Sequence, residues 1–297
     1  MPIKHPPATR WTLWLPVRGP FAMNDLLIHV RSLDPWTWAT EYGVRLAALI
    51  DATVTGAFVY PSPLQVAPTY SSPELLAAVF ASARETGALA RAQAQPFLHW
   101  AREQGVAQAA WHVAEGEASR ALAHIGTWHD LLVVDRGPDP ATHVPAELAR
   151  LILAVGLPCL VVPRHRVAHV ALDCIAIGWN GSQEAVRAIH AALPLLQRAN
   201  RIVLLEGTPR RAYPEITWKP PLDIDLYLQR HAVHAEHRPL GNDAGEAGEA
   251  LLEGAAHVGA NLLVMGAYGR SRFSEWALGG ATRHVLADAA LPVLLRH

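Results

Sequence analysis

The chain has 297 residues, of which 51% are hydrophobic and 17% charged, so it can form buried cores and is not disordered or collagen-like. Its 25 Lys and Arg against 26 Asp and Glu give a formal net charge of -1, which argues against nucleic-acid binding through phosphate neutralisation. No stretch reaches the roughly 18 consecutive apolar residues that span a bilayer. The opening MPIKHPPATR lacks the apolar run of a signal peptide. We therefore expect a soluble, cytoplasmic protein with neither a nucleic-acid nor a membrane partner.

Strands and helices are expected to alternate along the first half. In chain order, the patterns predict a strand at 12–17 (TLWLPV), a helix at 38–51, a strand at 52–60, a long helix opening with SSPELLAAVF, and strands near 109–114, 130–137 and 157–165. The long helix has the clearest start, because Ser71 and Glu74 have capping-box spacing and Pro73 suits a first turn.

The second half shows the same alternation. Its expected elements are a strand at 173–179, a helix at 181–199, a strand at 201–207, a helix near 223–231, a strand near 233–238, a helix near 243–259, a strand at 261–266, and a final helix and strand. The helix at 181–199 carries one apolar stripe of Ala185, Ile189, Ala192 and Leu196.

A weak internal repeat links the two halves. DLLVVDRG (130–137) is followed by LPCLVVPRH, and NLLVMGAYG (261–269) is followed by LPVLLRH. Asp130 and Asn261 align at an offset of 131, whereas Pro158 and Pro292 align at 134, so the second copy has three extra residues in its loop. The continuously apolar strands are typical of parallel strands that helices cover on both faces. We expect two tandem doubly wound α/β domains, 1–165 and 166–297, which meet at the linker 163–167.

A glycine-rich loop follows the apolar strand at 261–266. Gly266 ends the strand, Gly269 follows three residues later, and Gly279 and Gly280 precede a helix. Glycine allows a ligand to approach the backbone, and a helix N-terminus attracts phosphate, so the pattern favours a phosphate cradle. On spacing alone, a tight strand-to-helix turn explains it equally well. Neither a Walker A loop nor G-x-G-x-x-G is present.

The spacing of these glycines resembles the signature of the universal stress protein family, G-x2-G-x9-G followed by Ser or Thr. The terminal segment GRSRFSEWALGGATRHVLADAALPVLLRH and the segment IAIGWNGSQEAVRAI (175–189) are also similar to that family. The resemblance is clear over the second half and present in outline over the first. It implies a tandem protein of five-stranded α/β units, joined as an intramolecular pseudo-dimer through the final strands, with homodimer formation as a further expectation.

The resemblance also implies a site for ATP, with Mg²⁺, or for another adenine nucleotide. Its residues would be Asn180 near the nucleoside, Met265, Gly266 and Gly269 along the phosphates, and Gly279, Gly280 and Thr282 at the outer phosphates. Two of these depart from the family pattern. Asn180 stands where an aspartate is usual, and Gly280 replaces the hydroxyl residue of the signature. Thr282 is an equally good candidate for that missing hydroxyl or for a helix cap.

The first half is expected to lack the site. Asp135 takes the position of Gly266, and Pro145 takes that of Gly279. A carboxylate would repel phosphate. The segment LPVRGPF (15–21) also lacks the turn that follows the first strand of the second half. We therefore interpret residues 1–165 as a structural or partner-binding half without nucleotide.

Other patterns are open to more than one interpretation. His231, His234 and His237 have an H-x2-H-x2-H spacing, which we interpret as surface or capping histidines rather than a metal site. Ser182 is expected to cap a helix rather than act as a nucleophile, since G-x-S-x-G is absent. Cys159 and Cys174 are expected to be buried thiols.

The leading hypothesis is a stress-response protein that binds ATP in its second half and has no dedicated catalytic chemistry, with at most slow ATP hydrolysis. The alternative is an adaptor of the same fold that binds a protein partner and no nucleotide. A small-molecule enzyme is a third hypothesis, with Glu206 and Ser182 as its nearest candidate groups.

Overall fold

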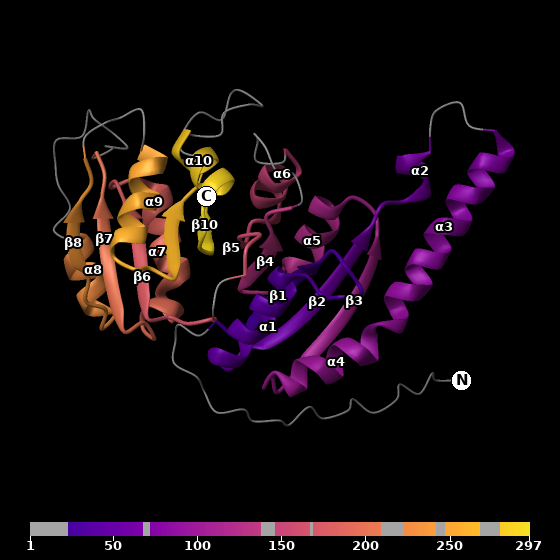
Figure 1. Cartoon of the computed structure of the whole chain (residues 1–297), viewed down its shortest axis with the longest axis horizontal. Coiled ribbons are helices and arrows are strands. Elements are labelled where there is room, and N and C mark those ends of the chain that lie inside the picture. Colours follow the sequence, from indigo (N-terminus) through magenta and orange to yellow (C-terminus); the bar gives the residue numbers. More distant parts are fainter. Residues whose placement is uncertain are drawn as a thin grey trace, which may run out of the picture.

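The structure is a computed structural model, and it describes residues 23–67, 72–137, 146–166, 169–208, 223–241, 247–267 and 280–297. The described strands form one ten-stranded sheet, and helices cover both of its faces (Figure 1). This arrangement is the α/β, doubly wound architecture that the alternation of strand and helix patterns predicts.

The first half contains five of these strands. Its elements are β1 (Asp25–Val30), α1 (Trp38–Leu49), β2 (Thr53–Tyr60), α2 (Pro63–Val66), α3 (Pro73–Ala92), α4 (Ala94–Glu103), β3 (Ala109–Glu115), α5 (Ala118–Gly126), β4 (Leu131–Asp135), α6 (Ala146–Val155) and β5 (Cys159–Val162).

The second half contains the other five. Its elements are β6 (Cys174–Trp179), α7 (Gln183–Leu196), β7 (Arg201–Glu206), α8 (Ile224–Arg230), β8 (Glu236–Pro239), α9 (Ala247–His257), β9 (Leu262–Gly266), α10 (Gly280–Asp288) and β10 (Val293–Arg296).

The strand order is β3-β2-β1-β4-β5-β10-β9-β6-β7-β8. Within each half every pair is parallel, and both halves have the same internal order. The halves join where β5 and β10 pair antiparallel, with Leu160 opposite Leu294. The expectation that the final strands join the two units is therefore confirmed.

Both hydrophobic cores continue across this junction. On one face, side chains of α1 and α4 belong to the same buried cluster as those of α7 and α8. On the other face, α5 and α6 share a cluster with α9 and α10. Leu160 and Leu294 are fully buried in the first of these clusters. The two halves thus share their cores, and burial of this continuous apolar surface stabilises them together.

Equivalent hydrogen bonds recur in the two halves. Asp130 Oδ2 accepts from the backbone N–H groups of Asn24 and Asp25, at 2.7 and 3.1 Å, and Asn261 Oδ1 accepts from that of Cys174 at 3.2 Å. The Leu132 N–H donates to the carbonyl of Pro158, as that of Leu263 does to Pro292. Asp130 and Asn261, like Leu132 and Leu263, are 131 residues apart, and Pro158 and Pro292 are 134 apart, which are the offsets that align the two sequences.

Two predicted element boundaries need correction. The first strand beside β2 and β4 is β1, at Asp25–Val30, and the predicted strand at 12–17 lies outside the described residues. The N-cap of α3 is Ser72, whose side chain accepts from Leu75 N–H, with Pro73 in the first turn. Ser71 lies outside the described residues.

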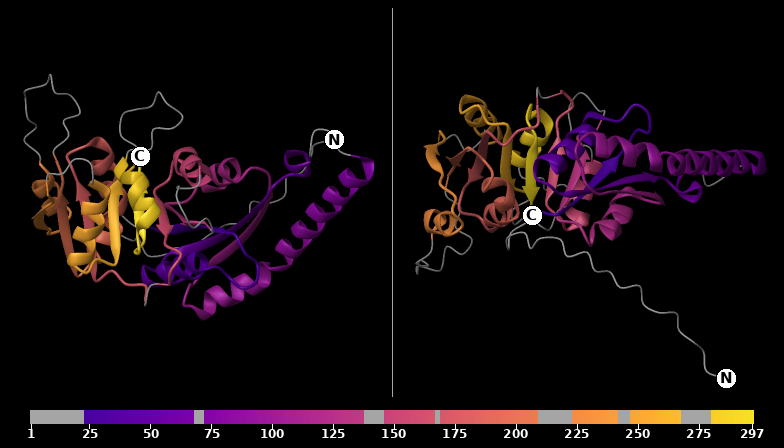
Figure 2. Two further views of the ribbon diagram at one scale, coloured as in Figure 1. Left: turned by 45° about the horizontal axis from the view of Figure 1, so that its top comes forward. Right: turned by 90° about the horizontal axis from the view of Figure 1, so that it is seen from below.

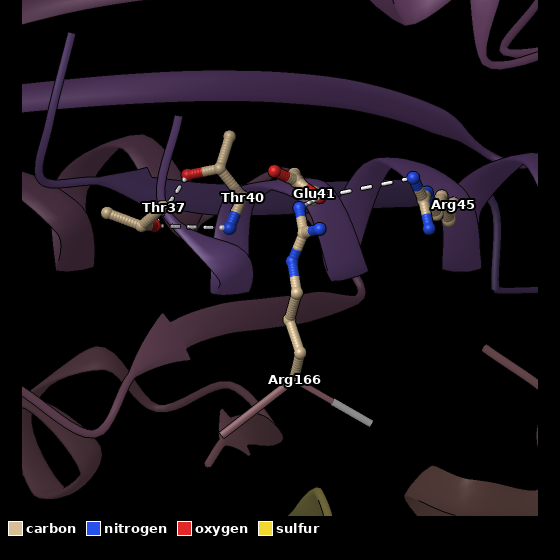
Figure 3. A network of polar contacts seen from close by, with 5 residues as sticks. All are labelled: Thr37, Thr40, Glu41, Arg45 and Arg166. Carbon is tan, nitrogen blue, oxygen red and sulfur yellow. Dashed lines mark hydrogen bonds and ion pairs between the residues drawn. The ribbon is translucent and has the colours of Figure 1, made fainter. Parts of the chain in front are cut away.

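The linker between the halves is tied to the first half. Arg166 donates to Glu41 on α1, which also pairs with Arg45 at 3.9 Å (Figure 3). The Arg166 guanidinium also lies 5.3 Å from the centre of the Trp38 ring, within cation–π range. Beside it, Arg164 Nε donates to the carbonyl of Gly137 at 2.6 Å. These contacts hold residues 163–166 against the first half.

Both cysteines are buried and free, as expected. Burial raises the pKa of Cys159 to about 12, so this thiol is unreactive at neutral pH. In the part of the chain that the structure describes, none of the helices combines the length and the apolar character needed to cross a membrane.

Candidate functional site

The candidate site lies at the carboxyl ends of β6 and β9. These strands are neighbours in the second half, although they are far apart in sequence, and their connections leave in opposite directions across the sheet. Open α/β sheets bind ligands at this kind of reversal point. Gly178 is opposite Met265, so the residues that follow, Trp179–Asn180 and Gly266–Ala267, lie together at this edge.

The turn after β6 is fixed by its own side chains. Asn180 Oδ1 accepts from the Ser182 N–H at 3.1 Å, and Gly181 has a φ of 74°, which favours glycine. Ser182 Oγ accepts from the Ala185 N–H at 3.2 Å, so the predicted role of Ser182 as the N-cap of α7 is confirmed. The amide oxygen of Asn180 is thus engaged, while its Nδ2 group has donors for a ligand.

Gly266 packs directly against the first turn of α7. A Cβ placed on it would lie 2.5 Å from the backbone carbon of Glu184 and 2.6 Å from the nitrogen of Ala185. No larger residue fits there unless the helix moves. The glycine therefore has a packing function of its own, whether or not its backbone also lies beside a ligand. Met265, just before it, is a core residue with 5% exposure.

The start of α10 differs from that of α7. Among the residues that the structure describes, a Cβ placed on Gly280 would meet no atom within 4 Å. Thr282 is buried, at 5% exposure, which favours packing within the helix over direct phosphate contact. The predicted site residues Gly269 and Gly279 lie outside the described residues.

A group that sequence reasoning missed lies beside this edge. His237 Nδ1 is 2.8 Å from Glu206 Oε1, and its Nε2 is 2.7 Å from Asp225 Oδ1. The bonds to Glu206 and then to Asp225 raise the pKa of His237, so these carboxylates favour its charged form. The three residues come from β7, α8 and β8. The sequence drew attention to His237 through its spacing and to Glu206 as an enzyme candidate, but not to their contact or to Asp225.

The histidine pattern does not assemble into a metal site among the described residues, where no three His, Cys, Asp or Glu side chains form a suitable group. His231 instead has its ring 4.6 Å from that of Tyr227. Glu206, a candidate for the enzyme hypothesis, is engaged with His237.

The corresponding edge of the first half has different residues. Because Leu26 pairs with Leu131 as Ile175 does with Leu262, Val30 corresponds to Trp179, and Arg31 then corresponds to Asn180. The earlier comparison with LPVRGPF is therefore wrong, since that segment precedes β1. Asp135 Oδ1 accepts from the Gly137 N–H at 2.7 Å, so the carboxylate shapes its own turn.

Comparison with known proteins agrees with this geometry. A model of the universal stress protein family matches residues 172–297. The fold is similar to that of a universal stress protein from Archaeoglobus fulgidus, with a TM-score of 0.65 and 12% identity over 93% of this chain and 97% of that chain. It is also similar to a functionally unknown protein from Pseudomonas aeruginosa, with a TM-score of 0.55 and 15% identity over 93% of this chain and 92% of that one.

None of the curated proteins matches the chain. The structural similarities extend over both halves, but at such low identity they establish the fold alone. The sequence match is confined to the half that has Asn180 and Gly266 at the strand ends. Residues 172–297 are thus the part of the chain that is similar in sequence to the universal stress protein family.

Proposed function

We propose that the chain is a tandem universal stress protein that binds ATP or a related adenine nucleotide in its second half. The observation that carries the proposal is the position of Asn180 and Gly266 on the two strands that flank the reversal point of the sheet. The boundary between the two units is proposed at residues 165 and 166, as the sequence predicts.

The proposed nucleotide lies with its nucleoside near Asn180 and its phosphates toward the loop between β9 and α10. Two features support this orientation: no described atom lies within 4 Å of a Cβ placed on Gly280, and α10, a nine-residue helix, begins there. Asn180 contributes N–H donors to the ribose, because its oxygen is held by Ser182. ATP would bring Mg²⁺ with it.

No catalytic step is proposed. His237, a group with proton-transfer chemistry, bonds a carboxylate through each ring nitrogen. A histidine in that state has no lone pair with which to activate water. We therefore expect ATP hydrolysis that is slow at most, with the nucleotide acting as a regulatory ligand.

Calorimetric titration with Mg·ATP tests the proposal, and the starts of α10 and α6 supply matched variants. Gly280→Asp places a charge where phosphate is proposed, and an acidic residue at a helix start does not weaken the helix. Ala146 begins α6 as Gly280 begins α10, so Ala146→Asp is the control. We expect one site per chain, a loss of at least about tenfold in affinity for Gly280→Asp, and no change for Ala146→Asp.

Asn180→Asp tests the nucleoside end. The carboxylate keeps an acceptor for the Ser182 N–H and adds one for the ribose, so the variant should bind ATP more tightly. If neither ATP, AMP nor a cyclic nucleotide gives heat or raises the Tm of any variant, nucleotide binding is wrong.

Absence of binding for all of these nucleotides would favour the alternative function, that of an adaptor. Two observations support it: the side-chain oxygen of Asn180 is engaged by Ser182, and packing on α7 suffices to explain Gly266. An adaptor also needs an exposed surface for a protein partner.

A further inference from the structure

The first half has a helical arm that stands away from the sheet (Figures 1 and 2). We define the arm as α2 together with residues 73–83 of α3. Of the 20 residues of α3, only Gly87 and Ala90 are buried, and both are in its second half. That second half packs near the sheet, where the Gly87 Cα is close to the Tyr60 ring. The first half of the helix therefore projects beyond the protein core.

The arm is apolar although it is exposed. Residues 75–83, LLAAVFASA, include no charged side chain. The exposed fractions are 78% for Leu64, 51% for Val66, 45% for Leu75 and 37% for Phe80. Within the described residues, none of these four belongs to or packs against either core cluster. A helix that is apolar on all sides is normally buried, so this surface needs a partner.

Part of the apolar surface forms a stripe along one face of α3. Leu76, Val79 and Ala83 are half-buried and have the spacing of one helix face, which continues into Gly87 and Ala90. The face that packs on the sheet at the end of α3 thus extends along the arm, where α2 also contacts α3. Leu75 and Phe80 flank this stripe, and α2 adds Leu64 and Val66.

We infer that the arm binds the arm of a second copy of this chain, so that the protein forms a two-fold symmetric homodimer. An uncharged apolar stripe is complementary to itself, which a two-fold contact requires. Antiparallel packing of two α3 helices would place stripe against stripe and oppose their dipoles. The formal net charge of -1 gives no long-range repulsion between copies.

The area available matches what a dimer needs. A large apolar side chain offers on the order of 150 Å², so the four most exposed ones leave on the order of 300 Å² in water. A stable interface buries about 800 Å² on each partner, of which roughly half is apolar. The half-buried stripe, the exposed alanines at 77, 78 and 81, and the other arm residues supply the remainder.

Sedimentation equilibrium of the full chain tests the inference. We expect the mass of two chains for the wild type and of one chain for the double variant Leu75→Glu, Phe80→Glu. Glutamate is a good helix former, and both positions are exposed in the monomer, so the variant should keep the circular dichroism spectrum of the wild type. Leu153→Glu on α6, where the wild-type leucine is 47% exposed, is the matched control and should remain dimeric.

A cysteine at position 80 identifies the contact directly. The native cysteines are buried, so Phe80→Cys introduces the one readily oxidised thiol among the described residues. We expect it to form a disulfide-linked dimer under mild oxidation, and Leu153→Cys to form none. The inference is wrong if the wild type is monomeric up to about 1 mM, where even a millimolar Kd leaves half of the chains paired. It is equally wrong if the double glutamate variant remains dimeric.

Discussion

The two halves of this chain share one strand order and differ at the strand ends that a ligand would contact. In the second half, Asn180 and Gly266 flank the reversal point, and in the first half Arg31 and Asp135 take their places. The buried strands are interchangeable because burial requires only apolar residues. Residues at the strand ends contact solvent, a ligand or a helix, so different residues are tolerated there in the two halves. The comparison teaches that one architecture can carry different residues at the same strand ends, turn-forming ones in the first half and those of the proposed site in the second.

Exchanging the residues at the ends of β9 and β4, Gly266 and Asp135, should give the largest effect on the free energy of unfolding. Gly266→Asp would force a Cβ against the backbone of α7, and we expect it to lower the free energy of unfolding by at least about 3 kcal/mol. Asp135→Gly removes only the bond to the Gly137 N–H, with a cost of about 1 kcal/mol. Urea unfolding of both variants measures the difference. Equal stabilities would contradict the packing function of Gly266.

A destabilising substitution at the junction of β5 and β10 should lower the stability of both halves. Leu294→Ala opens a cavity at a fully buried site in the shared core, with an expected cost of about 3 kcal/mol. Because both cores continue across β5 and β10, the two halves should still unfold in one transition. Fluorescence, to which Trp36, Trp100 and Trp111 of the first half contribute, should coincide with circular dichroism of the whole chain. A fluorescence transition unchanged by the substitution would show that the halves unfold separately.

Two histidines, one in each half, should change the stability of the protein with pH in opposite directions. Burial, with a smaller effect of Arg31, lowers the pKa of His29 in the first half to about 4, from 6.5. The folded state then resists protonation, so His29 makes the protein lose stability as pH falls from 6.5 toward 4. The raised pKa of His237 acts in reverse: its contribution is complete below pH 6.5 and is lost as pH rises through the raised value.

Tm measured against pH for two variants separates these effects. His29→Gln should gain on the wild type as pH falls below 6.5. His237→Gln should be least stable relative to the wild type in mild acid and approach it above pH 6.5. If the curve of Tm against pH for either variant runs parallel to that of the wild type, the corresponding histidine does not contribute to the pH dependence of stability.

Much of the fold is predictable from sequence, because continuous apolar strands and one-sided helix stripes follow directly from burial. β9 and α7 are examples, with their predicted ranges close to those observed. β1 escaped prediction because DLLIHV carries polar residues at Asp25 and His29, while the upstream TLWLPV is more uniformly apolar. Asp25 is used at the strand end, where it accepts from the Thr53 hydroxyl.

The site is predictable only where a motif is local in sequence. Asn180 and Gly266 could be assigned from their neighbours along the chain. The packing of Gly266 on α7 could not, because it depends on the distance between a strand and the helix that covers it. The contacts of His237 with its two carboxylates were missed for the same reason, since these are 12 and 31 residues away in sequence and come together only through the fold.

Hydrogen exchange with and without Mg·ATP tests most directly whether only the second half retains the site. We predict slower exchange in the turn and helix start at 179–186, at 265–267 and at the start of α10, and no change in the corresponding first-half segments 30–41 and 134–137. Such a pattern would locate the nucleotide at the reversal point of the second half. Protection of the first-half segments, or of neither half at saturating ATP, would contradict the account.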